Sequence, residues 1–193
     1  MTKAIFLDRD GTINIDYGYI GNPNLVKLFD GVGEGIKKLK DELKFQVIVV
    51  SNQSGITRGL IKAEDVENVN KKINEILESY NTRIDAFYYC PFHPDFDSQE
   101  DIICRKPSPN MILQAAKDFN VDLKKSFMIG DRETDILCGI NAGVKTVLLK
   151  NTISDEKINE LKNSQNSPNF IACNFLDAVS YIDNNILGEF VES

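Results

Sequence analysis

The sequence predicts an α/β fold, a doubly wound, Rossmann-like parallel sheet with helices on both faces. Short apolar stretches alternate with amphipathic stretches along the chain, which is the pattern of strands followed by helices. Clusters of polar residues directly follow several of the apolar stretches. The composition, 42% hydrophobic and 26% charged, is typical of a globular protein. Because 193 residues correspond to about one domain, we expect a single domain over residues 1–193.

Six apolar stretches are expected to form the strands of the sheet. They lie near residues 4–8, 46–50, 85–89, 126–130, 144–149 and 169–172. The stretch 47–50, Val-Ile-Val-Val, has the composition and length of a buried strand. Alternation of such strands with helices implies that the strands pair in parallel.

Six helices are expected between and after these strands. They lie near residues 31–43, 63–79, 108–119, 133–142, 154–163 and 175–186. The third opens with Ser108 as N-cap and Pro109 at the first helical position. Three of its apolar residues are spaced to form a buried stripe, namely Ile112, Ala116 and Phe119.

The strongest functional signal lies in residues 5–14, which read Ile-Phe-Leu-Asp-Arg-Asp-Gly-Thr-Ile-Asn. Asp8 and Asp10 can converge at the strand end because alternate residues of a strand share a face. Two carboxylates this close repel each other unless a cation or a proton lies between them. Magnesium prefers such hard oxygen ligands, and Gly11 lets the chain turn without a side chain in the way. The alternative is a strand that runs into an acidic turn.

Further polar clusters follow the expected strands or precede helices. Residues 51–55, Ser-Asn-Gln-Ser-Gly, follow the second strand, Asp131 and Asp135 follow the fourth, and Arg105 and Lys106 lie between them. In an open parallel sheet such strand ends gather in one crevice, where ligands bind. Each cluster has a simpler alternative, which is a helix cap or turn, a helix N-terminal charge pair, or a solvated loop.

The charge and the cysteines restrict the partners and the location. A net charge of −7 argues against nucleic acid and against an anionic membrane surface. No apolar run approaches the length of a transmembrane helix, and no signal peptide is recognisable. We therefore expect a cytoplasmic monomer without nucleic-acid or membrane partners. The irregularly spaced cysteines are expected to be free thiols and not a disulfide framework; they are Cys90, Cys104, Cys138 and Cys173.

Taken together, residues 8–14, 51–59 and 104–107 resemble the haloacid dehalogenase superfamily of phosphatases, and within it the heptose bisphosphate phosphatases. The resemblance covers roughly residues 4–150. It implies hydrolysis of the 7-phosphate of D-glycero-D-manno-heptose 1,7-bisphosphate. It also implies a haloacid dehalogenase type of sheet without a large cap domain, because residues 12–30 leave room only for a flap or loop.

The resemblance assigns chemical roles to the clustered residues. Asp8 is the implied nucleophile, which forms an aspartyl phosphate, and Asp10 is the implied general acid and base. The resemblance implies that Asp8, Asp131 and the main-chain carbonyl of Asp10 hold Mg²⁺. Asp135 either holds the metal through water or orients Asp131 or Lys106. Ser51 and Lys106 are the residues implied to contact the oxygens of the transferred phosphoryl group.

The resemblance also implies a set of substrate contacts around the reacting phosphate. Arg132 occupies a position where the heptose enzymes usually have lysine. Arg105 offers a planar guanidinium that suits an anionic sugar phosphate. The complete set of implied substrate-binding residues is Asp16, Tyr19, Ser51, Asn52, Gln53, Ser54, Arg105, Lys106 and Arg132.

A structural zinc site, often found in the heptose and histidinol phosphatases, is incomplete in this sequence. Of the Cys-x-His and Cys-x-Cys pairs that bind the zinc there, only Cys90 and Cys104 are present. Phe92 and Ile102 replace the other two ligands, and His93 lies one position late. Structural zinc requires four ligands. We therefore expect Mg²⁺ without zinc, a loop packed by Phe92 and Ile102, and a structural or solvent-facing His93.

Three other functions remain to be compared with this one. A phosphatase for histidinol phosphate or another small phosphomonoester would use the same residues. A receiver-type phospho-aspartate switch would place its aspartate after a later strand and would not need Gly11 and Thr12. A binding module without activity is disfavoured because every catalytic position is filled.

Overall fold

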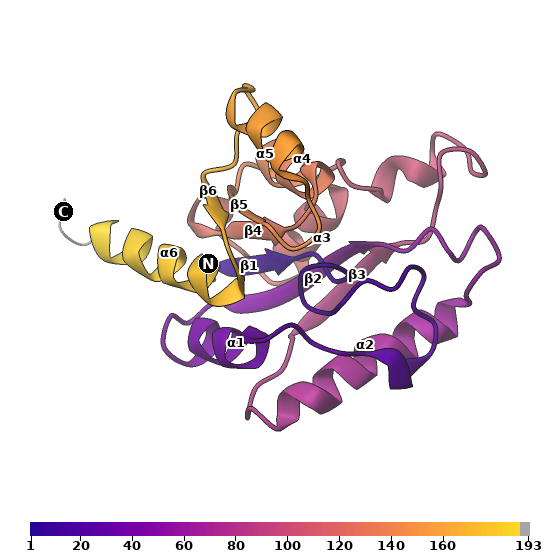
Figure 1. The fold of residues 1–193 in the computed structure, drawn as a ribbon, viewed down its shortest axis with the longest axis horizontal. Coiled ribbons are helices and arrows are strands. Elements are labelled where there is room, and N and C mark those ends of the chain that lie inside the picture. The colour runs from indigo at the N-terminus through magenta and orange to yellow at the C-terminus, as the bar shows by residue number, and fades with distance from the viewer. Residues whose placement is uncertain (190–193) are drawn as a thin grey trace.

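The computed structural model describes residues 1–189, which fold around a six-stranded sheet (Figure 1). All strand pairs are parallel, and the order across the sheet is β3-β2-β1-β4-β5-β6. The strands are β1 (Ala4–Leu7), β2 (Gln46–Asn52), β3 (Ala86–Cys90), β4 (Phe127–Gly130), β5 (Lys145–Leu149) and β6 (Phe170–Ala172).

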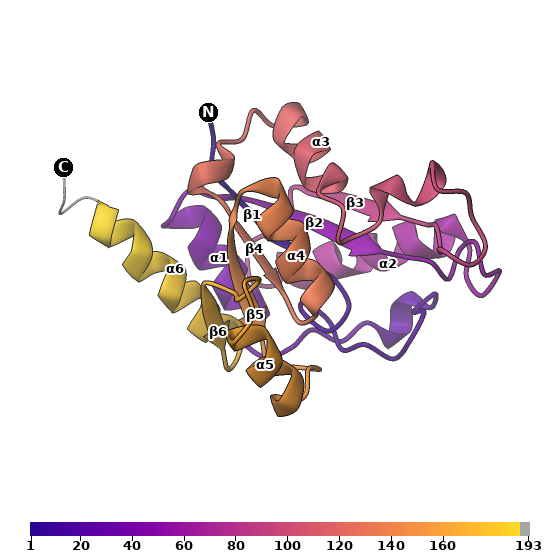
Figure 2. The same cartoon turned by 90° about the horizontal axis from the view of Figure 1, so that it is seen from above.

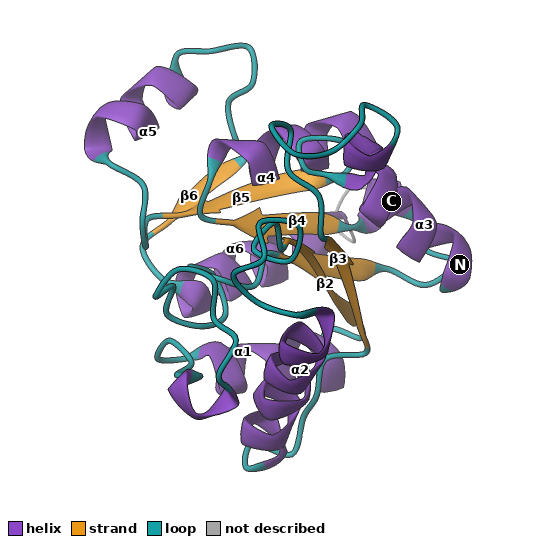
Figure 3. Ribbon diagram, turned by 90° about the vertical axis from the view of Figure 1, so that its right-hand side faces the viewer, coloured by secondary structure: helices purple, strands orange, loops and turns teal. Residues whose placement is uncertain are grey.

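Helices cover both faces of the sheet. The α-helices are α1 (Val32–Asp41), α2 (Ala63–Glu78), α3 (Asn110–Asp118), α4 (Glu133–Ala142), α5 (Asp155–Lys162) and α6 (Phe175–Glu189). One face packs against α1, α2 and α6, and the other against α3, α4 and α5 (Figure 3). Seen from above, α4 lies over β4 and β5 (Figure 2). The doubly wound fold predicted from the sequence is therefore confirmed.

The central strand β1 shows why the strands are almost purely apolar. Ile5 and Leu7 point into the core under α1, α2 and α6, whereas Ala4 and Phe6 point into the core under α3 and α4. All four side chains are fully buried. A parallel strand covered on both faces has no solvent-facing side, so its sequence is a continuous apolar run.

Helix α3 differs from its prediction in its start and in its buried face. It begins at Asn110, because Pro109 takes the N-cap position and the hydroxyl of Ser108 accepts a hydrogen bond from the Asn110 N–H at 3.4 Å. Ala116 and Phe119 are only partly buried at the edge of the core. The apolar spacing identified the helix but not which of its residues face the sheet most directly.

The segment between β1 and α1 forms a flap and not a cap domain. Its only helical turn in the described structure is the short 3-10 helix η1 (Pro23–Leu25). An isolated antiparallel bridge joins Asn14 to Leu28 and closes the flap at its base. Among the described residues, no helix combines the length and the apolar character needed to cross a bilayer.

The strand order places a switch point between β1 and β4. From β1 the chain winds outward through β2 and β3, and it then returns to β4 and winds in the other direction through β5 and β6. The loops after β1 and β4 therefore leave the sheet in opposite directions. In open α/β sheets the crevice at such a point binds ligands.

Candidate active site

A cavity of about 740 Å³ opens at the switch point, above the carboxyl ends of the central strands. Most of the residues predicted for the site line it, together with His93, Thr152 and Lys157. The predicted residues that line it are Asp8, Asp10, Asp16, Tyr19, Asn52, Gln53, Ser54, Arg105, Lys106, Asp131, Arg132 and Asp135.

Asp8 lies at the centre of the cavity, directly after β1. Its backbone N–H donates to the carbonyl of Ile129 in β4 at 3.0 Å, which fixes the strand end. Its Oδ1 accepts a hydrogen bond from Nζ of Lys106 at 2.6 Å. The same Nζ reaches Oδ1 of Asp135 at 2.7 Å and the carbonyl of Val50 at 2.8 Å. An ammonium has three donors, so each donor of Lys106 has a partner in the free protein.

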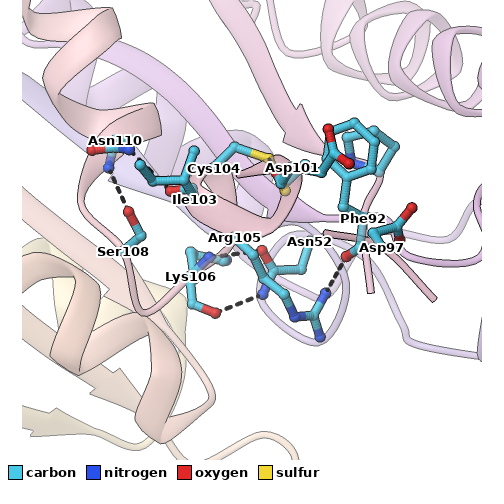
Figure 4. The surroundings of a disulfide bond; sticks show 12 residues. Asn52, Phe92, Asp97, Asp101, Ile103, Cys104, Arg105, Lys106, Ser108 and Asn110 are labelled. Carbon is cyan, nitrogen blue, oxygen red and sulfur yellow. Dashed lines mark hydrogen bonds between the residues drawn. A yellow bond between two sulfur atoms is a disulfide. The ribbon is translucent and has the colours of Figure 1, made fainter. Parts of the chain in front are cut away.

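The backbone of Lys106 is held as firmly as its side chain. Asn52 donates from Nδ2 to the Lys106 carbonyl at 3.1 Å and accepts from the Lys106 N–H at its Oδ1, at 3.0 Å (Figure 4). This paired contact joins the end of β2 to the loop before α3. Asn52 thus sets the position from which the lysine enters the cavity.

The buried charges of the site shift one another's pKa values. Burial raises the pKa of Asp8 to about 6, with the charges of Asp135 and Asp10 adding to the rise and Lys106 opposing it. Burial and the neighbouring Asp8 raise the pKa of Asp131 to about 6. Burial lowers the pKa of Lys106, but Asp135 and Asp8 outweigh it, so that the pKa is raised overall. The carboxylates therefore repel each other, and a cation between them would relieve the repulsion.

The donor set fits a divalent cation with hard oxygen ligands. Oxygens of Asp8, Asp131 and Asp135 lie within 4.8 Å of one another. Asp135 is already engaged by Lys106 and by the backbone N–H of Arg132 at 3.0 Å. Asp8 and Asp131 remain as ligands, and magnesium prefers such carboxylates. The turn that follows Asp10 requires glycine at position 11. Gly11 has a φ of +88°, and a Cβ there would collide with the Asp131 carboxylate.

Asp10 lies in a different environment, surrounded by donors. Oδ2 of Asp10 accepts from Nη2 of the fully buried Arg9 at 2.8 Å and from Nε2 of Gln53 at 2.8 Å. Its Oδ1 accepts from Nδ2 of Asn14 at 2.9 Å. Burial alone would raise the pKa of Asp10, but Arg9, Asn14 and Gln53 outweigh it, so the pKa is lowered. Asp10 is therefore a carboxylate in the free protein.

Asp131 is held by two hydroxyls to which the sequence analysis assigned no role. Thr12 donates to its Oδ1 at 2.9 Å, and Thr152 donates to its Oδ2. Arg9, which pairs with Asp10, is a further residue to which the sequence analysis assigned no role. Thr12 belongs to the recognised motif, whereas Thr152 carries no sequence signal beyond its place after an expected strand.

Ser51 is the predicted site residue that does not line the cavity. It is only 3% exposed, and its hydroxyl accepts from Nε2 of Gln53 at 3.4 Å. The carbonyl of its neighbour Val50 contacts Lys106 instead. Gln53, which contacts Ser51, lines the cavity itself.

The flap closes over the cavity from one side. Oδ2 of Asp16 pairs with Nη2 of Arg132 at 2.8 Å, and its Oδ1 accepts from the N–H of Gly18 at 2.8 Å. The hydroxyl of Tyr19 contacts the Arg58 guanidinium, whose carbon lies 5.3 Å from the centre of the Tyr19 ring. The flap is therefore held at two points by side chains from other loops.

Cys90 and Cys104 form a disulfide with a Cα–Cα distance of 5.5 Å (Figure 4). The prediction of free thiols was therefore wrong for this pair, and it is confirmed for the buried Cys138 and the exposed Cys173. Cys90 ends β3, and the 3-10 helix η2 (Asp101–Cys104) brings the second cysteine back to it across a separation of 14 residues. Irregular spacing in a sequence cannot show such a return. The bonded sulfurs are not available as thiolate ligands.

The disulfide adjoins the residues that face the cavity from this loop. Cys104 directly precedes Arg105, whose Nη1 donates to the carbonyl of Phe92 at 3.2 Å (Figure 4). His93 lies in the same loop, packs against Phe96 and lines the cavity. Its Nδ1 accepts from the N–H of Asp95 at 3.2 Å. The loop thus presents Arg105 and His93 to the cavity from fixed positions.

Known proteins are similar to this chain in sequence and in fold. The family model described as "HAD-hyrolase-like" matches residues 103–178. The D-glycero-D-manno-heptose-1,7-bisphosphate 7-phosphatase of Chlorobaculum tepidum is 40% identical over 187 residues, 92% of each chain. The D-glycero-beta-D-manno-heptose-1,7-bisphosphate 7-phosphatase of Helicobacter pylori is 43% identical over 148 residues, which cover 76% of this chain and 82% of that protein.

The fold has a solved counterpart. The crystal structure of the D,D-heptose 1,7-bisphosphate phosphatase from B. bronchiseptica, complexed with magnesium and phosphate, superposes with a TM-score of 0.83. It is 24% identical and covers 95% of this chain and 99% of its own. On the strength of its sequence relatives, this chain belongs to the heptose-1,7-bisphosphate 7-phosphatase family of haloacid dehalogenase-like hydrolases.

Proposed function

We propose that this protein is a magnesium-dependent phosphatase that removes the 7-phosphate of D-glycero-D-manno-heptose 1,7-bisphosphate. The observation that carries the proposal is the position of Asp8, held by Lys106 at 2.6 Å and within 4.8 Å of an Asp131 oxygen at the base of an open cavity. Relatives named for this reaction match over most of the chain. Phosphate monoesters are hydrolysed extremely slowly in water, so positioning and charge stabilisation must supply most of the catalysis.

In the proposed mechanism Asp8 attacks the phosphorus in line, and the bond from phosphorus to the sugar oxygen breaks. Asp10 protonates the leaving alkoxide and later takes a proton from the water that hydrolyses the aspartyl phosphate. Mg²⁺, when bound by Asp8, Asp131 and the Asp10 carbonyl, neutralises charge on the nucleophile and on the phosphoryl oxygens. Because its pKa is lowered in the free protein, Asp10 must gain its proton as substrate binds.

Lys106 and its partners keep the nucleophile in place during the reaction. The ammonium contacts Asp8 on one side and Asp135 on the other, so it offsets the negative charge that a phosphate brings into the cavity. Of the roles open to Asp135, the 2.7 Å contact favours orienting Lys106. The Ser51 hydroxyl accepts from Gln53, so its own O–H remains available to donate to a phosphoryl oxygen.

The residues around the mouth of the cavity are suited to a sugar with a second phosphate. Arg105 and Arg132 line the cavity beyond the reacting centre, where they can contact an anionic group. Asp16 and Tyr19 of the flap can meet sugar hydroxyls, and so can Asn52, Gln53 and Ser54. A cavity of about 740 Å³ without a cap domain admits a substrate of this size.

A substrate panel tests the proposal. Phosphate release is measured with Mg²⁺ for heptose 1,7-bisphosphate, histidinol phosphate and glucose 6-phosphate, and phosphorus NMR identifies the phosphate that is lost. We expect the highest kcat/KM for the bisphosphate, with loss at C7. A preference for histidinol phosphate, or loss at C1, would overturn the assignment of substrate.

The proposal includes a monomeric, cytoplasmic enzyme without nucleic-acid partners. The net charge of −7 supports the last point. The disulfide weighs against a reducing compartment, where such bonds are rare. Sedimentation of the purified protein and fractionation of cells that express it test the two remaining points.

A further inference from the structure

A short segment after β5 reaches the site although no sequence motif marks it. Nδ2 of Asn151 donates to the carbonyl of Gly11 at 2.9 Å, across 140 residues of sequence. The hydroxyl of the next residue, Thr152, donates to Oδ2 of Asp131. Two consecutive side chains therefore connect the loop after β1 with the loop after β4, which are the two loops that supply the candidate metal ligands.

The contact from Thr152 completes the surroundings of a carboxylate that is entirely buried. Asp131 has no exposed surface, and Thr12 already donates to its other oxygen at 2.9 Å. Each carboxylate oxygen can accept about two hydrogen bonds. One hydroxyl on each oxygen fixes the rotation of the carboxylate and leaves an acceptor site on each oxygen for another partner. A carboxylate held in this way is preorganised for binding a cation.

We propose that Thr152 is a positioning residue whose hydroxyl holds Asp131 in the orientation that binds a divalent cation. The inference rests on the proposed function, because it takes Asp131 as a ligand of Mg²⁺. Asn151 assists by holding the Gly11 turn, which directly follows the Asp10 carbonyl. Groups that orient a metal ligand in this way typically contribute about 10- to 100-fold to metal affinity or activity.

Because Thr152 lies at the surface, a positioning role and a structural role predict different effects of its substitution. Thr152 is exposed, so replacing its hydroxyl by a methyl group removes no packing from the core. A purely structural role predicts a small effect on stability and none on metal affinity. A positioning role predicts a selective loss of metal affinity.

The test compares Thr152→Val with Thr152→Ser, which restores the hydroxyl, in the full chain. Thr2→Val serves as the matched control, since the hydroxyl of Thr2 donates to the Phe119 carbonyl at 3.0 Å and Thr2 does not line the cavity. Calorimetric titration with Mg²⁺ alone, without substrate, gives the affinity. Thermal unfolding without metal verifies that each variant is folded.

We expect Thr152→Val to weaken Mg²⁺ binding about 10- to 100-fold. Thr152→Ser should recover most of the affinity, and Thr2→Val should match the wild type. Unchanged Mg²⁺ affinity in a folded Thr152→Val protein would overturn this inference and leave the proposed function intact. A wild-type protein that neither binds Mg²⁺ nor needs it for phosphate release would overturn the proposed function and this inference together.

Discussion

The floor of the cavity, formed by Asp8, Lys106 and Asp131, is built from strand ends and a buried lysine. The rim, formed by Asp16, Tyr19, Arg105 and Arg132, is built from loops that hold one another. Side chains of the floor are at least nine-tenths buried, whereas Arg132 is 58% exposed in its pair with Asp16. The sheet fixes the floor, whereas contacts between loops and the disulfide beside Arg105 fix the rim. In the proposed enzyme the floor therefore sets the reaction and the rim sets the substrate.

This division predicts two kinds of variant. Substitutions in the floor should affect every phosphate ester equally, because each ester presents the same reacting group. Substitutions in the rim should affect a large substrate more than a small one, since only the large one reaches the loops. The variants and labelling experiments below test this division between floor and rim.

The largest effect is expected from Asp8 of the floor and from Asp10, the proposed acid–base group that lies two residues after it. Asp8→Asn should abolish turnover of all substrates, because an amide does not attack phosphorus. Asp10→Asn should lower kcat by about 10²- to 10⁴-fold, the usual contribution of one acid–base group. Rates of phosphate release from the bisphosphate and from an aryl phosphate are the measurement. An Asp8→Asn protein that keeps a tenth of the wild-type activity would show that the floor is wrongly assigned.

The next largest effect concerns stability. Lys106→Met leaves the buried Asp8 and Asp135 without their cation, and breaking a buried pair typically costs about 3–5 kcal/mol. Arg132→Met breaks only the exposed pair with Asp16, for which about 0–1 kcal/mol is usual. Urea unfolding of the metal-free variants gives both free energies of unfolding. Similar losses in the two variants would contradict the difference between floor and rim.

Arg105→Ala tests substrate selection at the rim. A charge-assisted hydrogen bond contributes about 1.5–3 kcal/mol, so kcat/KM for the bisphosphate should fall roughly 10- to 150-fold. The same variant should affect a small aryl phosphate less, because that substrate lacks the distal groups. Equal losses on both substrates would place Arg105 at the reacting phosphate and move it from the rim to the floor.

The smallest effect is a difference in reactivity among the four cysteines, and measuring it requires no substitution. Cys138 lies buried beside the floor, and burial raises the pKa of its thiol to about 12. Near neutral pH without reductant, we expect an alkylating reagent to label the exposed Cys173 quickly and Cys138 only after unfolding. Cys90 and Cys104 should react only after reduction, which mass spectrometry of the labelled protein verifies. Labelling of these two in the native, unreduced protein would mean that the loop of Arg105 is held without a disulfide.

The same division explains how much could be predicted from the sequence. The α/β fold followed from alternating apolar and amphipathic stretches. Asp8, Lys106 and Asp131 could be grouped because strand ends converge in a parallel sheet. Each of these inferences depends on local sequence, because a parallel sheet places the residues that follow its strands at the same edge.

Contacts between distant loops could not be predicted in this way. The disulfide joins Cys90 to Cys104 through a turn that the spacing does not reveal. Thr152 meets Asp131 only because β5 lies beside β4. The contact between Ser51 and Gln53 likewise depends on how the two side chains are placed. Such contacts arise from tertiary packing, which a single sequence does not specify.

The most direct test of the account is to locate the phosphoryl group during turnover. The enzyme is mixed with Mg²⁺ and either the bisphosphate or an aryl phosphate and quenched in acid, and its peptides are then analysed by mass spectrometry. The account predicts a phosphoryl group on Asp8 with both substrates, which disappears when substrate is exhausted. A phosphoryl group on another residue, or phosphate release with none on Asp8 at any quench time, would contradict it.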